Sequence, residues 1–81
     1  MKISVKLFAA AKQRAGSDAV QVELPPPATV AQLRSALAEQ HPSLASLLPH
    51  ARFAINSDYA ADQAAIPAAA EIAIIPPVSG G

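Results

Sequence analysis

Side chains of the kinds that catalyse reactions are few and scattered in this sequence. The six carboxylates are Asp18, Glu23, Glu39, Asp58, Asp62 and Glu71. No spacing among them pairs two on one face, so solvated surface groups are the simplest interpretation. Each histidine, His41 and His50, adjoins a proline, which is typical of an exposed loop position. Ser17 and Ser79 lack the strand–turn–helix context of a nucleophilic serine.

The composition excludes several other kinds of site. The absence of cysteine removes disulfides, thiolate metal sites and a cysteine nucleophile, and two histidines alone do not predict a metal centre. The three glycines are Gly16, Gly80 and Gly81, and none opens a helix as part of a glycine-rich phosphate-binding loop. We therefore expect no bound metal and no bound cofactor.

The C-terminal glycine pair is the feature that points to chemistry. Gly80 and Gly81 follow a Pro-Pro pair and a short spacer in a chain that otherwise avoids glycine. Without a Cβ atom, such an end is slim and reaches backbone angles closed to other residues. Six residues after Ile75 span about 20 Å, enough to enter a channel in a partner. The main-chain carboxylate of Gly81 is therefore the candidate reactive group; an inert, frayed tail is the alternative.

Length and charge limit the class of protein. Eighty-one residues allow one domain, and 52% hydrophobic against 15% charged residues indicates a folded globule. A net charge of zero gives no basic stripe for nucleic acid, and no window approaches the ~20 apolar residues of a membrane helix. Lys6 interrupts the N-terminal apolar run, so no signal peptide is predicted and a cytoplasmic location is expected. Few aromatic residues predict modest stability, which favours a permanent partner.

Hydrophobic periodicity predicts an alternation of strands and helices. The expected elements are a strand over 1–8, a helix over 9–15, a strand over 20–24, a helix from 30 to about 41, one turn over 43–48, a strand over 52–56, a short strand at 59–60 and a last strand over 71–75. Thr29 and Gln32 fit a capping box, and Arg34 is expected to face water. Phe53 and Ile55 are expected to point inward. The pattern predicts an α+β domain over 1–75, with one main helix on one face of the sheet, followed by a flexible tail over 76–81.

Several stretches together resemble the small, sulfur-carrier subunit of molybdopterin synthase. They are VKLFAA at 5–10, TVAQLR at 29–34 and AIN at 54–56. The ending EIAIIPPVSGG at 71–81 is the most specific, because family members end in an acidic residue, an apolar strand, Pro-Pro-Val, Ser or Thr, and Gly-Gly. The resemblance covers essentially the whole chain and implies a ubiquitin-like β-grasp fold with a mixed sheet.

The sequence departs from this family in three places. Residues 67–71 read PAAAE where a glycine-containing turn is usual, so the turn must close without glycine. Ile74 and Ile75 stand where aromatic residues are common, and Lys12 stands where an arginine is common. None of these changes touches the C-terminal tail.

The resemblance implies a specific chemistry for the tail. An ATP-dependent enzyme would adenylate the Gly81 carboxylate, and sulfur from a donor would replace AMP to leave a thiocarboxylate. Gly81 is then the sulfur carrier, Gly80 its slim neighbour, and Ser79, Val78 and Pro77 the segment that lines the channel of a partner. The sulfur would pass to a cyclic pyranopterin precursor, and two such transfers would build the dithiolene that binds molybdenum.

The resemblance also implies two protein partners. One is the large subunit of molybdopterin synthase, which supplies the catalytic side chains, in a heterotetramer of two small and two large subunits. The other is the adenylating and sulfurylating enzyme, which uses ATP. On this interpretation the chain alone is not catalytic and binds no cofactor.

Phe8 and Ile75 are the candidate contacts with the large subunit. By alternation, Phe8 lies opposite the buried face of the first strand, and Ile75 opposite the buried face of the last. If the first and last strands are neighbours, the two side chains join one apolar patch leading to Val78. The alternative is that Phe8 packs under the short helix.

Three other functions remain open from the sequence. A thiamine-biosynthesis sulfur carrier also ends in Gly-Gly, but is usually shorter and lacks the Pro-Pro-Val approach. A ubiquitin-like protein modifier would share the activation chemistry and form isopeptide bonds with lysines. A β-grasp binding module with an inert tail would keep its function after deletion of Gly81.

Overall fold

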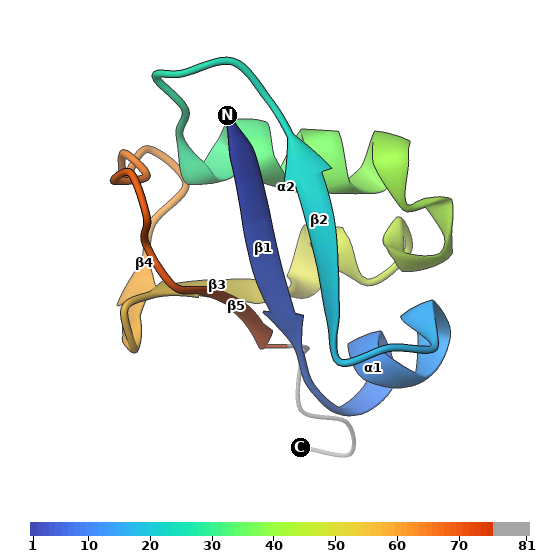
Figure 1. Ribbon diagram of the computed structural model, residues 1–81. Coiled ribbons are helices and arrows are strands. Elements are labelled where there is room, and N and C mark those ends of the chain that lie inside the picture. The colour runs from blue at the N-terminus through green and yellow to red at the C-terminus, as the bar shows by residue number, and fades with distance from the viewer. Residues whose placement is uncertain (76–81) are drawn as a thin grey trace.

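A five-stranded mixed sheet forms one layer of the molecule, and the long helix α2 crosses one of its faces (Figure 1). The computed structural model describes residues 1–75. The strands are β1 Lys2–Leu7, β2 Ala19–Glu23, β3 Arg52–Ile55, β4 Asp58–Ala60 and β5 Ile72–Ile75. The helices are α1 Ala9–Ala15 and α2 Val30–Gln40, followed by the 3-10 turns η1 Pro42–Leu44 and η2 Leu48–His50. The predicted α+β architecture is confirmed; the predicted tail, residues 76–81, lies outside the described residues.

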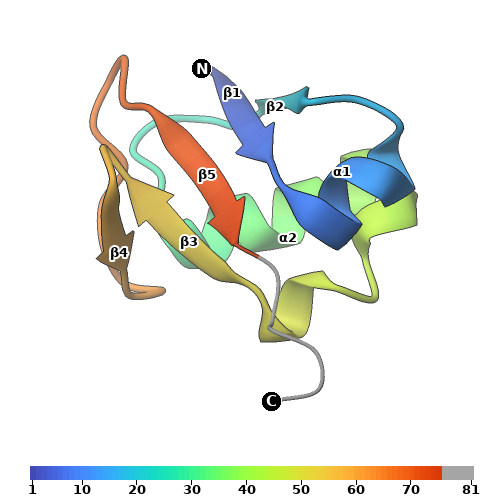
Figure 2. The ribbon, with the colours of Figure 1, turned by 90° about the horizontal axis from the view of Figure 1, so that it is seen from below.

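The strand order places the first and last strands side by side. The order is β2-β1-β5-β3-β4, with β1 and β5 parallel and the other neighbours antiparallel. Figure 2 shows the C-terminal ends of β1 and β5 next to each other. The expectation that the first and last strands are neighbours is therefore confirmed.

Alternation along β1 divides the sheet into a buried and an outer face. Its six residues run exposed, buried, exposed, buried, exposed, buried, as the sequence predicts. On the buried side, Val5 packs in one core cluster with Val30, Leu33 and Leu37 of α2. These three positions recur at helical spacing, so one stripe of α2 covers the sheet.

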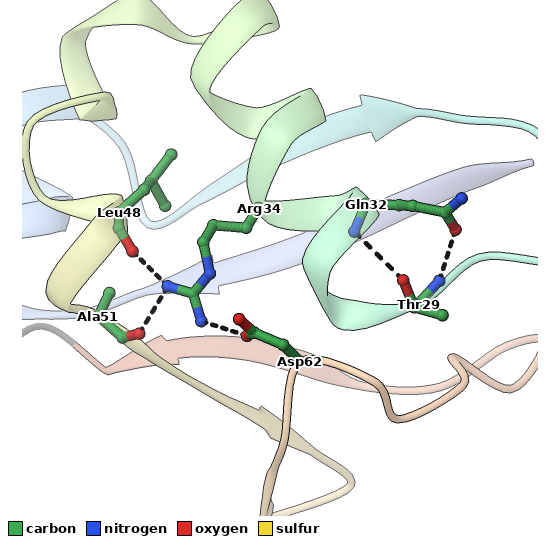
Figure 3. Close-up of polar contacts among 6 residues, drawn as sticks. All are labelled: Thr29, Gln32, Arg34, Leu48, Ala51 and Asp62. Carbon is green, nitrogen blue, oxygen red and sulfur yellow. Dashed lines mark hydrogen bonds and ion pairs between the residues drawn. The ribbon is translucent and has the colours of Figure 1, made fainter.

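Local signals determine where both helices begin and end. At the start of α2, Thr29 N donates to Gln32 Oε1 at 2.9 Å and Gln32 N donates to Thr29 Oγ1 at 3.3 Å (Figure 3). This reciprocal pair is the predicted capping box. At the end of α1, Gly16 adopts a left-handed conformation with φ 73° and donates its N–H to Lys12 O at 2.9 Å.

Two local predictions need correction. The single turn expected over 43–48 is instead two 3-10 turns, because a proline starts η1 and a second proline lies inside η2. The inward orientation predicted for Phe53 and Ile55 of β3 is confirmed, since Phe53 is buried and the half-buried Ile55 packs against the core cluster. Ala54 between them faces the outer side and is also buried, because it is small and stands directly opposite Tyr59 of β4.

Arg34 is the second correction, because its side chain is only 22% exposed instead of facing water. Its Nη1 donates to the carbonyl oxygens of Leu48 and Ala51, and its Nη2 lies 2.7 Å from Asp62 Oδ1 (Figure 3). The guanidinium also lies 4.9 Å from the centroid of the Phe53 ring. The planar fork of Arg34 therefore ties α2 to the segment that enters β3.

The turn before β5 closes without glycine, as the sequence requires, through an alanine in an unfavourable conformation. Ala69 has φ 60°, and Ala70 N donates to Pro67 O at 3.3 Å. A left-handed conformation costs a residue with a Cβ atom roughly 1 kcal/mol.

We therefore expect Ala69→Gly to raise the free energy of unfolding by about 0.5–1 kcal/mol. Urea denaturation measures this change. The matched control is Ala68→Gly, whose native φ is not positive, and which should be neutral or destabilising. Equal effects of the two substitutions would contradict the assignment of strain to Ala69.

Candidate functional site on the outer face of the sheet

The outer face of the sheet carries a row of side chains whose register is set by strand pairing. Lys6 pairs with Ala73, Ala73 with Ala54, and Ala54 with Tyr59, so one row crosses β1, β5, β3 and β4. Two alanines occupy the middle of this row. Because an alanine side chain is a single methyl group, the centre of the row is low and its ends are high.

A groove of about 430 Å³ lies over these alanines. Its lining residues are Lys6, Phe8, Ala54, Ser57, Tyr59, Glu71, Ala73 and Ile75. Lys6 and Glu71 bring one charge of each sign to the walls, and Phe8, Tyr59 and Ile75 bring the larger apolar side chains. This mixed lining is suited to a protein surface that carries both apolar and polar groups.

The structure brings Phe8 and Ile75 together in this groove. Phe8 follows β1 directly and is 44% exposed, and Ile75 is the half-buried last residue of β5. The neighbouring residues Ile72 and Ile74 are each 1% exposed in the core, so the predicted alternation along the last strand is confirmed. The contact of Phe8 and Ile75 with a partner stays a prediction.

Tyr59 belongs to the same groove and was missed by sequence reasoning. Its side chain is 65% exposed, the largest exposure among the large hydrophobic residues described. The Arg52 guanidinium lies 5.3 Å from the centroid of its ring, which favours one orientation of the tyrosine. The signal was available in part, since Tyr59 is the single tyrosine of a chain with 4% aromatic residues.

Lys12 lies away from the groove and forms an exposed ion pair. Its Nζ is 2.8 Å from Asp18 Oδ1, where it bridges α1 and the segment before β2. The hydrogen bond and the charge of Lys12 lower the pKa of the Asp18 carboxyl below its usual value, and Asp18 in turn raises the pKa of Lys12. The pair contributes its small stabilisation above the ordinary pKa of aspartate and loses it as acid protonates Asp18.

The other candidate groups do not form a site within residues 1–75. His41 Nε2 lies 2.8 Å from the carbonyl oxygen of Gln21, and His50 is exposed at the end of η2. In this described part of the chain, no three His, Cys, Asp or Glu side chains gather in a way that could hold a metal ion.

The described helices are also all too short or too polar to cross a membrane.

The predicted tail residues lie outside the part of the chain that the structure describes. They are Pro77, Val78, Ser79, Gly80 and Gly81. Ile75 is the last residue before this tail in the sequence, and it lies in the lining of the groove.

The chain is similar over its whole length to known proteins. The sequence model of the ThiS family matches residues 5–81. The molybdopterin synthase sulfur carrier subunit of Chlamydomonas reinhardtii is 36% identical, with 100% of both chains covered. Small archaeal modifier protein 1 of Haloferax volcanii is 39% identical, covering 94% of this chain and 97% of that one.

A solved structure shares the fold. The crystal structure of SAMP1 from Haloferax volcanii has a TM-score of 0.84 and 35% sequence identity, with 100% of both chains covered. The predicted β-grasp fold is confirmed by this likeness. Since the family model matches nearly the whole chain, and both sequence relatives exceed 30% identity over nearly their full length, the chain belongs to the ThiS family.

Proposed function

We propose that this chain is the sulfur-carrier subunit of a molybdopterin synthase and that the carboxylate of Gly81 carries the sulfur. The observation that carries this proposal is the family match, which extends through the glycine pair to Gly81. A relative that is covered over its full length bears that function in its name, with 36% identity. The scarcity of catalytic side chains agrees with a protein whose reactive group belongs to its main chain.

The proposed charging reaction converts an unreactive carboxylate into a sulfur donor. A carboxylate oxygen of Gly81 attacks the α-phosphate of ATP, pyrophosphate leaves, and an acyl adenylate forms. Hydrosulfide released by a sulfur donor then attacks the carbonyl carbon, forms the C–S bond and expels AMP, and loss of the S–H proton leaves the thiocarboxylate. Every group that binds ATP belongs to the activating enzyme. Glycine suits the position because no Cβ atom obstructs attack at the carbonyl carbon.

The proposed sulfur acceptor is a cyclic pyranopterin precursor held by the large synthase subunit. That subunit supplies the catalytic side chains, and two sulfur transfers complete the dithiolene. The proposed assembly is a heterotetramer of two small and two large subunits, and a cytoplasmic location stays a prediction. We assign the groove on the outer face to contact with the large subunit, because the groove adjoins Ile75 and therefore the start of the tail.

The groove residues should contribute to partner binding and little to stability. We expect Phe8→Ala, Tyr59→Ala and Ile75→Ala each to weaken binding of the large subunit by about 1–3 kcal/mol. Ile75→Lys should cost more, because it places a charge in an apolar contact. Isothermal titration calorimetry measures the binding, and thermal unfolding measures the stability.

A matched control separates the groove from the core. Ile74 is next to Ile75 but only 1% exposed, so Ile74→Ala should lower the free energy of unfolding by about 2–5 kcal/mol. A groove variant that loses stability as much as binding would belong to the core. Unchanged binding in all three groove variants would contradict the assignment of this face to the large subunit.

A protein-modifier function is the second candidate, favoured by one observation. The relative with 39% identity is named small archaeal modifier protein 1. A modifier would use the same adenylate but pass the Gly81 carbonyl to a lysine amine. Isopeptide conjugates that carry the C-terminal peptide of this chain would support it, whereas a carrier without such a role gives none.

Genetic complementation tests the proposed function as a whole. A host that lacks its own molybdopterin synthase carrier subunit should regain molybdopterin when it expresses this chain. The same host expressing the chain without Gly81 should not. Recovery with both would contradict the proposed role of the terminal carboxylate, and recovery with neither would contradict the carrier assignment.

A further inference from the structure

The edge of the sheet at β2 is closed by side chains from the end of α2. Two hydrogen bonds show which opposite residues of β1 and β2 are bonded to each other. Leu24 N donates to Met1 O at 3.0 Å, and Leu7 N donates to Asp18 O at 2.8 Å. In an antiparallel ladder, the residues between such bonded positions direct their backbone groups away from the partner strand. The backbone N–H and C=O of Gln21 and Glu23 therefore point outward at this edge.

The amide of Gln40 satisfies both outward groups of Glu23. Glu23 N donates to Gln40 Oε1 at 3.1 Å, and Gln40 Nε2 donates to the Glu23 carbonyl oxygen at 2.8 Å. One partner that accepts from and donates to the same residue reproduces the bonded pair of an antiparallel sheet. Next to it, His41 Nε2 lies 2.8 Å from the carbonyl oxygen of Gln21.

The end of α2 is itself held in place. His41 caps α2 and donates its N–H to Leu37 O at 2.8 Å, and Leu37 is fully buried. The two side chains therefore stand on a backbone fixed by the core. A preorganised pair of this kind loses little conformational entropy when it binds the strand edge.

We propose that Gln40 and His41 form an edge latch that prevents β2 from pairing with β2 of a second copy of this chain. An open strand edge is a template for pairing with another strand. With five residues, β2 is long enough to pair, whereas the opposite edge strand, β4, has three. Of the four outward backbone groups of Gln21 and Glu23 that a neighbouring strand would need, the latch occupies three, all but the Gln21 N–H.

The sequence of β2 indicates why the strand that the latch keeps away from this edge is β2 of a second copy of this chain. Antiparallel pairing centred on Gln21 places Ala19 opposite Glu23 and Val20 opposite Val22. No like charges then stand opposite each other, and the two Gln21 amides meet at the twofold axis. The outward backbone groups of both copies fall in register, so β2 is complementary to itself once the latch is removed.

Removal of the latch tests the proposal. Sedimentation velocity over a concentration series should show the unchanged chain as a monomer of 8.3 kDa. The double variant Gln40→Ala/His41→Ala should shift to twice that mass as concentration rises. The control is Glu39→Ala, an exposed neighbour on the same helix, which should stay monomeric. A folded double variant that stays monomeric at every concentration would overturn the proposal.

Amide hydrogen exchange provides a readout on the unchanged protein. In the monomer, the Glu23 N–H should exchange about tenfold more slowly than the Gln21 N–H, because the Gln40 amide oxygen protects only the former. Gln40→Ala should abolish this difference. Equal exchange rates of the two amides before mutation would show that the latch does not close in solution and would equally overturn the proposal.

Discussion

Extension of the chain by one residue beyond Gly81 is expected to reduce sulfur transfer to background while leaving the fold of residues 1–75 unchanged. The carboxylate would then belong to the added residue, whose side chain would meet a channel suited to glycine. Molybdopterin formed with the large subunit, the activating enzyme, ATP and a sulfur donor measures the effect. The thermal midpoint of unfolding verifies that the domain is intact.

A removable extension is the matched control. A chain that carries a protease site after Gly81 should be inactive before cleavage and fully active once cleavage regenerates the Gly81 carboxylate. Full activity of the uncleaved chain would contradict the proposed role of the terminus. Inactivity after complete cleavage would locate the defect elsewhere in the protein.

Replacement of Arg34 by alanine is expected to lower the free energy of unfolding by about 3 kcal/mol. The change removes the donors to the Leu48 and Ala51 carbonyls and the contact with Phe53, and it leaves these carbonyls without their partner. Arg34→Lys should recover only part of the loss, because an ammonium group cannot reproduce the planar fork. Urea denaturation measures each free energy.

The control for Arg34 is the other arginine that bonds through Nη1. Arg14 is exposed and donates to Ser46 Oγ, so Arg14→Ala should change stability by less than about 0.5 kcal/mol. An equally small effect of Arg34→Ala would mean that the interactions around its guanidinium contribute no net stability. The substitution lies outside the groove, so binding of the large subunit per folded molecule should not change.

The elements of the fold could be predicted because their signals are local. Alternation along 1–8 and the capping box at Thr29 depend on residues within one element, and the structure confirms both. The left-handed Gly16 and the end of the long helix at Gln40 follow from similarly local preferences. The terminal glycine pair was identified in the same way, from composition and position.

The structure differs from the sequence-based predictions where a residue has its bonding partner far away in the sequence. Arg34 has helical spacing typical of a solvent-facing residue, and only the folded chain brings Asp62 and the carbonyl of Ala51 to it. The Gln40 amide likewise meets Glu23 across 17 positions of sequence. Periodicity predicts which face of an element a side chain occupies, but not which polar group from elsewhere in the chain bonds to it there.

The groove shows the same division between local and long-range information. Phe8 and Ile75 could be placed on the outer face by alternation, and the parallel pairing of β1 with β5 brings them together. Tyr59 joins them through its pairing with Ala54, which a short hairpin strand does not reveal in sequence.

Mass spectrometry of the C-terminal peptide shows directly whether Gly81 carries sulfur. The chain is incubated with the activating enzyme, ATP and a sulfur donor, and the peptide that ends in Gly81 is then weighed. We expect a mass increase equal to the replacement of one oxygen atom by sulfur, dependent on ATP and located on Gly81. A fully adenylation-competent system that leaves the mass of this peptide unchanged would contradict this expectation.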